Sequence, residues 1–501
     1  MVQTFNRNEA RPPPRRGAVG FKMNRVKTAL STFWGQVALF CLLTATVPVL
    51  RYFLLPIKNR YQLSPFFSFV EPYLGPFTLL PLVALFALTL CLRQALRAPA
   101  VVKYTYFTVT FFTLTVTVNA ALGGLHNLLP QALWQYLADA QKLYVHGNFL
   151  RDYHLHVESL HWHATVHPAG VFLYFYPLLR IFPAQSQWVW IALVNALLAG
   201  TGALFLYRAA GNLYGEKARA PAALLYVTAP SLLLYGSTID AVIAAYGAFT
   251  LYLLSRYLTR GRLRDGFLAG LAVAGGVFLA YQFGFFWVLL GVGTVLALRY
   301  APPPAASEGS PAARGKRGWL VASVAAAVGA FGAFFVALYF LTGFNVVAEF
   351  IHQLRASEKY YGSGENVWYL FNRYVLGGPA YEGPHRSALM WIPGNFLAFF
   401  FLLGPPTTIL FLRDLWRRLK ERPPRAAGAV FSIAAAASFL LINFSGFTLA
   451  ETERVWLFMT PWFLGGAASY LEERRPDLLF SVLAFNVLLS VAFVTFFRPI
   501  R

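Results

Sequence analysis

The stretch that decides the fold is Trp319-Leu-Val-Ala-Ser-Val-Ala-Ala-Ala-Val-Gly-Ala-Phe-Gly-Ala-Phe-Phe-Val-Ala-Leu-Tyr-Phe-Leu-Thr342, which contains no charged side chain. A helix rises about 1.5 Å per residue, so this run is long enough to span the roughly 30 Å hydrocarbon core of a bilayer. Lipid offers no hydrogen-bond partners, so the backbone must satisfy its own polar groups within the segment. Residues 319–342 are therefore predicted to form a transmembrane helix.

Similar apolar runs recur along the whole chain. They lie at about 31–50, 75–92, 104–122, 187–207, 219–236, 241–257, 266–282, 284–300, 319–342, 391–413, 427–444, 455–471 and 478–497. The chain of 501 residues is 57% hydrophobic and 12% charged, against about 25% charged in globular domains. This composition excludes a soluble enzyme and a disordered chain. The sequence predicts an all-α integral membrane protein with about 13 transmembrane helices.

The net charge of +22 indicates orientation rather than a nucleic-acid partner, because the basic residues stand in short tracts between the apolar runs. With the basic tail 1–28 in the cytoplasm, the loops predicted inside are rich in Arg or Lys: 93–103, 208–219, 256–265, 301–318, 413–426 and 472–477. The assignment assumes that 170–183, which contains Arg180, does not fully cross the membrane. We expect a multi-pass protein of the cell membrane with a cytoplasmic N-terminus.

The chain is predicted to comprise two transmembrane modules. The Pro-rich stretch 301–318 has the composition of a cytoplasmic linker. It separates an N-terminal module, 29–300, from a C-terminal module, 319–501. Each module has one long external loop, 123–186 in the first and 343–390 in the second. Cys41 and Cys91 both fall in predicted helices, where they are expected to pack rather than to form a disulfide or metal site.

All nine histidines fall in the two long external loops. Five of them are close enough in sequence to share a metal ion: His154, His156, His161, His163 and His167. However, no HExxH motif or cysteine ligand accompanies them. Polar lining of a sugar- and phosphate-binding cavity is the favoured interpretation. No cofactor is assigned, and a divalent metal is the alternative.

Two aspartates of the first external loop are candidate general bases. Asp139 and Asp152 each have a basic neighbour, Lys142 and Arg151, with which they could simply pair. Alternatively, a carboxylate near an apolar interface has a raised pKa and can accept a proton from an acceptor hydroxyl. The residues do not distinguish the two aspartates.

A short external turn places Glu451, Glu453 and Arg454 where the chain re-enters the membrane. Glu451 and Arg454 are three residues apart, so they could pair on one helix face. In the functional interpretation, the guanidinium of Arg454 binds a phosphate, for which its planar set of donors is suited.

Several short motifs resemble those of the bacterial polytopic glycosyltransferases of the GT-C superfamily. They are Phe149-Leu-Arg-Asp-Tyr153, the turn Thr165-Val-His167-Pro168-Ala-Gly170, Gly-Phe-Asn345, the segment from Asn395 to Gly404-Pro-Pro406, and Glu451-Thr-Glu453-Arg454-Val-Trp456. Two departures stand out. Ala169 replaces the second proline of the usual His-Pro-Pro-Gly turn. The loop after the first predicted helix, 51–74, offers only Glu71 as an acid.

The resemblance implies transfer of a sugar from a polyprenyl-phosphate-linked donor to a glycan, lipid or protein acceptor on the external face of the membrane. Donor binding is then expected to involve Glu451, Glu453, Arg454, His163, His167, Arg151 and Glu158, with Asp139 or Asp152 as the catalytic aspartate. Membrane lipids are the other expected partners, and nucleic acid is not expected. Two competing hypotheses are a flippase or transporter of a lipid-linked substrate, and a His-rich metal-dependent membrane enzyme. A flippase or transporter would be expected to have charged residues in the middle of its spans, and the sequence lacks them there.

Overall fold

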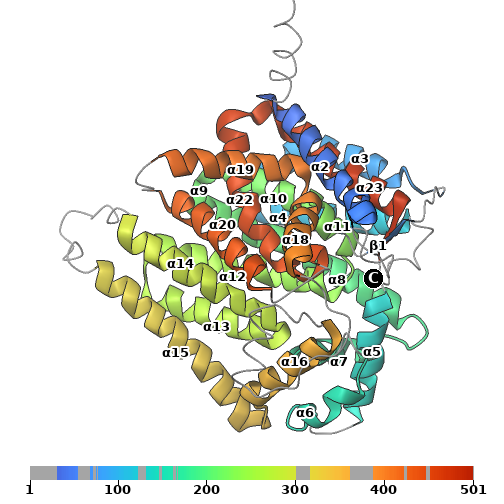
Figure 1. The fold of residues 1–501 in the computed structure, drawn as a ribbon, viewed down its shortest axis with the longest axis vertical. Helices are drawn as coiled ribbons and strands as arrows, with labels where there is room; N and C mark the ends of the chain where they lie inside the picture. The colour runs from blue at the N-terminus through green and yellow to red at the C-terminus, as the bar shows by residue number, and fades with distance from the viewer. Residues whose placement is uncertain are drawn as a thin grey trace, which may run out of the picture.

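The computed structural model describes residues 31–54, 68–70, 75, 77–121, 131–145, 149–161, 165, 167–300, 316–361, 388–421, 426–446 and 452–499. The described residues form a bundle of α-helices (Figure 1). Among them, one short antiparallel pair of strands, β1 (Ser68–Val70) and β2 (Phe497–Pro499), joins the segment before the second predicted span to the end of the last helix. The predicted tail 1–28, residues 301–315 of the linker and parts of both long loops lie outside the described residues.

The first module contains α2 (Phe33–Leu54), α3 (Leu80–Arg97), α4 (Ala100–Ala120), α5 (Gln131–Tyr144), α6 (Tyr153–His156), the 3-10 turn η3 (Val157–Ser159), α7 (Ala169–Ile181), α8 (Gln187–Gly200), α9 (Gly202–Tyr214), η5 (Glu216–Ala218), α10 (Arg219–Thr228), α11 (Pro230–Tyr235), α12 (Ile239–Arg260), α13 (Leu263–Leu279), η6 (Tyr281–Gly284) and α14 (Phe285–Tyr300). The second contains α15 (Lys316–Thr342), α16 (Val346–Tyr361), α18 (Ala388–Leu403), α19 (Pro405–Lys420), α20 (Ala427–Ser445), α21 (Thr452–Val455), η8 (Leu457–Met459), α22 (Thr460–Arg474), η9 (Pro476–Leu478) and α23 (Leu479–Phe496).

The structure supports the prediction of a multi-pass helical membrane protein. In the described part of the chain, eight helical segments are long and apolar enough to cross a membrane: Leu80–Arg97, Ala100–Ala120, Gln187–Tyr214, Ile239–Arg260, Tyr281–Tyr300, Leu320–Thr342, Ala427–Ser445 and Pro476–Phe496. A ninth is obtained if α18 and α19 are counted as one bent span. These numbers are lower than the 13 expected from the apolar runs.

The difference has local physical causes. The run 219–236 divides at Pro230, which has no N–H to continue the hydrogen bonding of α10. The run 391–413 divides at Gly404, whose φ of 105° is a backbone conformation that glycine adopts readily. The helices on either side are bent by 106° relative to each other. The remaining three runs form shorter helices: the apolar part of α2, the 17-residue α13 and the 15-residue α22.

Most of the segment 170–183 belongs to α7 (Ala169–Ile181), an apolar helix of 13 residues. At about 1.5 Å per residue it reaches roughly 20 Å, which is too short for the hydrocarbon core. Its length agrees with the assumption that this segment does not fully cross, although the sidedness of the loops stays a prediction.

Close packing of α13 against α15 depends on two glycines. A Cβ added at Gly266 or Gly270 would overlap the backbone of Ser323 or Ala327, respectively. The spacing Gly-x-x-x-Gly provides the flat surface on which two helices approach closely in lipid. This contact fixes α15, which continues through Gly343 to α16.

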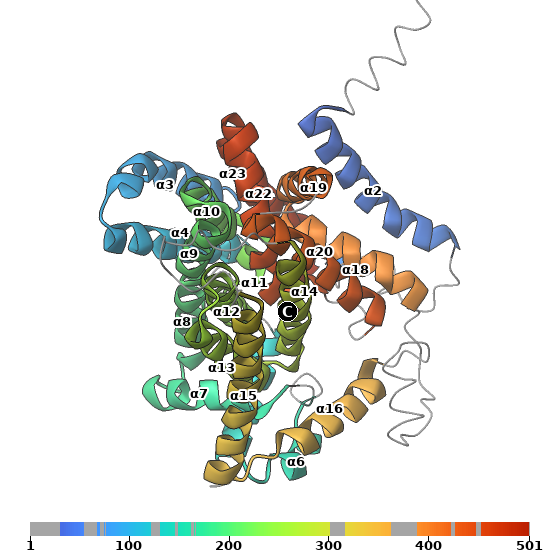
Figure 2. The same cartoon turned by 90° about the vertical axis from the view of Figure 1, so that its left-hand side faces the viewer.

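The elements of the two long loops gather at one end of the bundle. Figure 1 places α5, α6, α7 and α16 together at the bottom, whereas α19 crosses the top beside the start of α2. Figure 2 shows the same separation after rotation by 90° about the vertical axis. The described helices of the two long loops therefore share one end, and basic α19 lies at the other.

Candidate active site

The carboxylate of Asp139 joins α5 to the segment before α7. Its side chain is fully buried. The backbone N–H of His161 donates to Oδ2 at 2.8 Å, and Nδ1 of His161 lies 2.8 Å from Oδ1. Lys142, one helical turn further along α5, places Nζ 3.2 Å from Oδ1. Asp139 thus has both the expected lysine partner and a second, unexpected histidine partner.

The contact with Asp139 fixes the state of the His161 ring. A carboxylate oxygen accepts, so Nδ1 must carry the ring proton, and in the neutral ring Nε2 is left as an acceptor. The His161 side chain is 42% exposed, in contrast to the buried carboxylate. Nε2 is then the ring nitrogen that Asp139 does not engage, on a side chain that is partly exposed.

Asp152 lies in a different environment. It precedes α6, and its carbonyl accepts the backbone N–H of Leu155 at 2.9 Å. Its half-buried side chain does not cap the helix and makes no hydrogen bond to another described residue. The predicted pairing of Asp152 with Arg151 is absent from the described contacts. Arg151 instead packs its aliphatic stem against Gly343.

His167 and Arg454 are brought together from opposite halves of the chain. His167 packs its ring edge-on against Tyr136, with centroids 5.1 Å apart, and its carbonyl accepts the hydroxyl of Tyr153 at 2.7 Å. Burial, and secondarily the positive charge of Arg454, lowers the pKa of His167 to about 3. His167 is therefore neutral, and its buried Nδ1 has no hydrogen-bond partner among the described residues.

Arg454 is held near His167 by the contact between α21 and α18. Arg454 is only 7% exposed. Two residues earlier, the hydroxyl of Thr452 donates to the carbonyl of Asn395 in α18 at 3.3 Å. This anchors the short helix that carries the arginine. Glu451 and His163, and the side chains of Glu453 and Glu158, lie outside the described residues.

The sequence interpretation did not select Glu349, although the structure buries it in the same region. The residue is 1% exposed and lies in the first turn of α16. Asn345 begins this helix, since its Oδ1 accepts the backbone N–H groups of Val347 and Ala348. Burial raises the pKa of the Glu349 carboxyl to about 7, and a backbone hydrogen bond from His154 opposes the shift. Nδ1 of His154 lies 3.8 Å from Oε1.

Tyr153 connects these groups electrostatically. It is fully buried, and burial raises its pKa well above the usual value, with further contributions from the nearby Tyr281, Glu349 and Asp139. Tyr281 comes from η6, the break between two apolar helices. Its buried hydroxyl and Oε2 of Glu349 have no hydrogen-bond partner among the described residues. We refer to Asp139, Tyr153, His167, Glu349 and Arg454, together with His161 and Tyr281, as the polar cluster.

Metal binding by the five candidate histidines is not evident in the described residues. No group of three or more His, Cys, Asp or Glu side chains suited to a metal occurs among them. His154 faces Glu349, His161 is bound to Asp139, and His167 lies against Tyr136. His156 is half-buried. A metal site that includes His163 stays a prediction from the sequence.

Comparison with known proteins gives one family match. Residues 167–300 match the family described as dolichyl-phosphate-mannose-protein mannosyltransferase. The matched segment begins at His167 and runs through α14, and over it the match confirms the resemblance predicted from the sequence. No curated protein sequence matches the chain.

Two solved structures are similar to the chain. One is ArnT from Cupriavidus metallidurans bound to undecaprenyl phosphate, with 13% identity, 75% of this chain and 61% of that chain covered, and a TM-score of 0.47. The other is the same protein in the apo state, with 12% identity, coverages of 76% and 61%, and a TM-score of 0.48. The chain matches about three-fifths of the length of these structures.

Proposed function

We propose that the chain is a membrane glycosyltransferase that moves a sugar from a polyprenyl-phosphate-linked donor to an acceptor at the external face of the membrane. The family match over residues 167–300 supports a sugar-transfer reaction with a lipid-phosphate donor. The N-terminus is then cytoplasmic, and the polar cluster faces the exterior. In support, α5, α6 and α16, which carry Asp139, Tyr153 and Glu349, lie at the end of the bundle away from basic α19 (Figure 1).

The observation that carries the proposal is the convergence of Asp139, His167, Glu349 and Arg454 from four separate segments. Buried ionisable groups are costly to maintain, and their concentration in one place is typical of functional sites. Two of them, His167 and Glu349, have buried polar atoms without a described hydrogen-bond partner. A polar substrate would supply such partners.

The reaction can be assigned to these groups. A base removes the proton from the acceptor hydroxyl, and the acceptor oxygen forms a bond to the anomeric carbon of the sugar. The bond between that carbon and the donor phosphate oxygen breaks, and its electron pair stays on the polyprenyl phosphate. Arg454 stabilises the charge of the departing phosphate, since guanidinium donors bind phosphate oxygens strongly.

The base is assigned to Asp139 acting through His161, with Asp152 as the second candidate. The Asp139 oxygens already accept three donors, whereas Nε2 of His161 is oriented and its side chain partly exposed. A carboxylate that orients a histidine and stabilises its protonated form is a recurrent arrangement for proton removal. Asp152, half-buried and without a described partner, would act directly.

The experiment is a comparison of Arg454→Ala with Arg180→Ala in purified, reconstituted protein. Arg180 is an exposed arginine at the same end of the molecule, at the end of α7. With a panel of polyprenyl-phosphate sugars and a membrane extract as the source of acceptor, we expect wild-type protein and Arg180→Ala to release polyprenyl phosphate at similar rates. Arg454→Ala should lose about 30- to 1,000-fold in rate, corresponding to about 2–4 kcal/mol of charge stabilisation. Equal rates for the two variants would contradict the phosphate role of Arg454.

A further inference from the structure

A separate cavity lies at the opposite end of the bundle from the polar cluster. It has a volume of about 750 Å³ and is bounded by α2, α19 and α22. Figure 1 places α2 and α19 at the top, whereas α5, α6 and α16 lie at the bottom. None of its lining residues belongs to the polar cluster, so this cavity requires its own explanation.

One side of the cavity is apolar and borders the outer surface of α2. Leu39, Phe40 and Leu43 line it from this helix, and Leu412 lines it from α19. Leu39 is 40% exposed and Leu43 is 52% exposed, although both lie in an apolar helix. In a membrane protein, such side chains contact acyl chains. This wall therefore continues from the cavity onto a surface suited to lipid.

The other side of the cavity is strongly basic. Arg413, Arg417, Lys420 and Arg474 line it, and none of the described lining residues is acidic. Within the described part of the chain, Arg413, Lys420 and Arg474 have no carboxylate partner. Arg413 donates from Nε to Oε1 of Gln36 at 3.0 Å, and that amide is neutral. Three cations thus share one cavity without a counter-charge.

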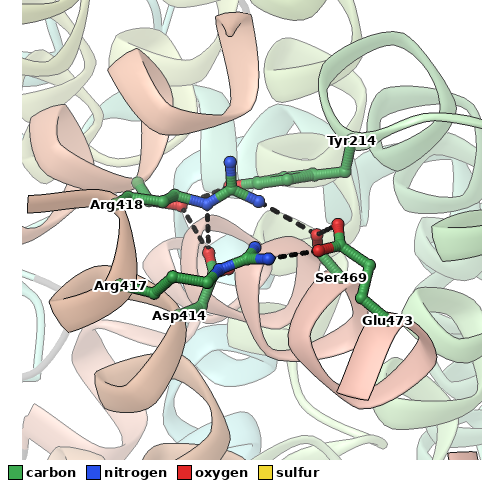
Figure 3. Close-up of polar contacts among 7 residues, drawn as sticks. Tyr214, Asp414, Arg417, Arg418, Ser469 and Glu473 are labelled. Atoms are coloured by element: carbon green, nitrogen blue, oxygen red, sulfur yellow. Dashed lines mark hydrogen bonds and ion pairs between the residues drawn. The ribbon is translucent and has the colours of Figure 1, made fainter. Parts of the chain in front are cut away.

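Two nearby carboxylates, Asp414 and Glu473, are already occupied by Arg417 and Arg418 (Figure 3). Fully buried Asp414 accepts Nε of Arg418 at 2.6 Å and Nη2 of Arg417 at 2.8 Å. Glu473 pairs with the other terminal nitrogen of Arg417 and accepts the hydroxyl of Ser469 at 2.9 Å. The Arg418 guanidinium also donates to Ser469 and stacks on Tyr214. This network fixes α19 to α22, so the cavity is built on a rigid frame.

The helix α19 has the composition of an interfacial helix. After the bend at Gly404 it carries four basic residues, and its Trp416 is 62% exposed. Lys420 lies over the Trp416 ring at 4.8 Å. Tryptophan and basic residues together are typical of helices that lie in the headgroup region of a bilayer. The cavity therefore lies where a lipid headgroup would be.

We propose that this cavity binds the phosphate headgroup of an anionic membrane phospholipid, with its acyl chains along the apolar face of α2. Arg413, Lys420 and Arg474 neutralise the phosphate, and Leu39 and Leu43 contact the first methylenes. Positive charges that only orient the protein need no cavity and no adjoining apolar wall. The combination of both features is what a phospholipid requires.

The test is native mass spectrometry of the full-length protein in non-ionic detergent, titrated with phosphatidylglycerol or phosphatidylcholine. We expect one saturable phosphatidylglycerol site and clearly weaker phosphatidylcholine binding. Each lost cation should weaken phosphatidylglycerol binding about fivefold, and Arg413→Gln/Arg474→Gln about 25-fold. The matched control is Arg475→Gln, because Arg475 neighbours Arg474 but pairs with Asp477 and does not line the cavity.

Three results would overturn the proposal. They are equal affinity for both lipids, unchanged phosphatidylglycerol affinity in the double variant, and complete displacement of the lipid by inorganic phosphate. The last would mean that acyl contacts contribute nothing. If the double variant does not fold, Arg474→Gln alone decides, since Arg474 is exposed and its loss should still cost about fivefold. Sugar transfer is not used as a readout, so failure here leaves the proposed function untouched.

Discussion

Replacement of Asp139 by asparagine is expected to abolish most of the turnover while leaving the protein folded. The carboxylate accepts the backbone N–H and Nδ1 of His161 and Nζ of Lys142. An amide has only one acceptor oxygen, so at least one of these donors must lose its partner, at a cost of no more than about 1–3 kcal/mol. The amide NH₂ also favours the ring tautomer in which Nδ1 accepts. Nε2 of His161 would then carry the proton and could no longer remove one from the acceptor.

The expected loss is about 100- to 10,000-fold in turnover, the range for losing a general base or its correct tautomer. The assay is the release of polyprenyl phosphate per folded protein, with the melting temperature measured on the same preparation. Lys142→Met is the matched control. It removes only a half-exposed ion pair worth about 0–1 kcal/mol, so turnover should change less than about fivefold.

Two variants separate the roles of Asp139 and His161. If Asp139 acts through His161, His161→Gln should lose as much activity as Asp139→Asn, and the double variant should be no worse than either. An active His161→Gln with an inactive Asp139→Asn would make Asp139 itself the base. Near-wild-type turnover in Asp139→Asn, whatever happens at His161, would refute the assignment and favour Asp152.

The remaining predictions concern phosphate binding, sidedness, a buried acid and helix packing. Arg454→Lys should recover only part of the activity lost in Arg454→Ala, because a lysine keeps the charge without the planar donors. Full recovery in a donor-turnover assay would argue against bidentate phosphate binding. Single cysteines placed in 130–165 should react with an impermeant thiol reagent in intact cells, and those in 302–316 should not. Labelling of the second range would mean that the orientation is the reverse of the predicted one. The raised pKa of Glu349 means that the folded protein retains a proton that the unfolded chain loses between about pH 4.5 and 7. Its contribution to stability is thus present at low pH and lost as the pH rises to 7, by about 3 kcal/mol. Glu349→Gln should therefore gain melting temperature relative to wild type between pH 5 and 7, and a pH-independent difference would contradict the buried-acid description. Gly270→Leu should separate α13 from α15 and lower the melting temperature, whereas an unchanged value would show that this close approach is dispensable.

The helical membrane fold could be predicted from the sequence because its signal is local. The run 319–342, for example, forms the span Leu320–Thr342 almost unchanged. Where an apolar run contains a break, as at Pro230 and Gly404, the structure divides it into two helices.

The contacts of the polar cluster were much less predictable. Asp139 was selected because it is an acid in a long loop, yet its partner His161 is 22 residues away. Burial of Glu349 depends on α16 packing near α6, and nothing in its own segment indicates that contact. Tyr281 lies in an apolar stretch, where a tyrosine is ordinary. Such groups become conspicuous only when distant segments bury them together.

The most direct test of the proposed function follows both halves of the donor at once. A polyprenyl-phosphate sugar labelled with ³²P in the phosphate and ¹⁴C in the sugar is supplied to the reconstituted protein with a membrane extract as the source of acceptor. We predict that the labels separate, with ¹⁴C on the acceptor and ³²P in free polyprenyl phosphate, and that Asp139→Asn prevents the separation. Labels that remain together while the intact donor crosses the bilayer would contradict glycosyl transfer and identify a lipid transporter.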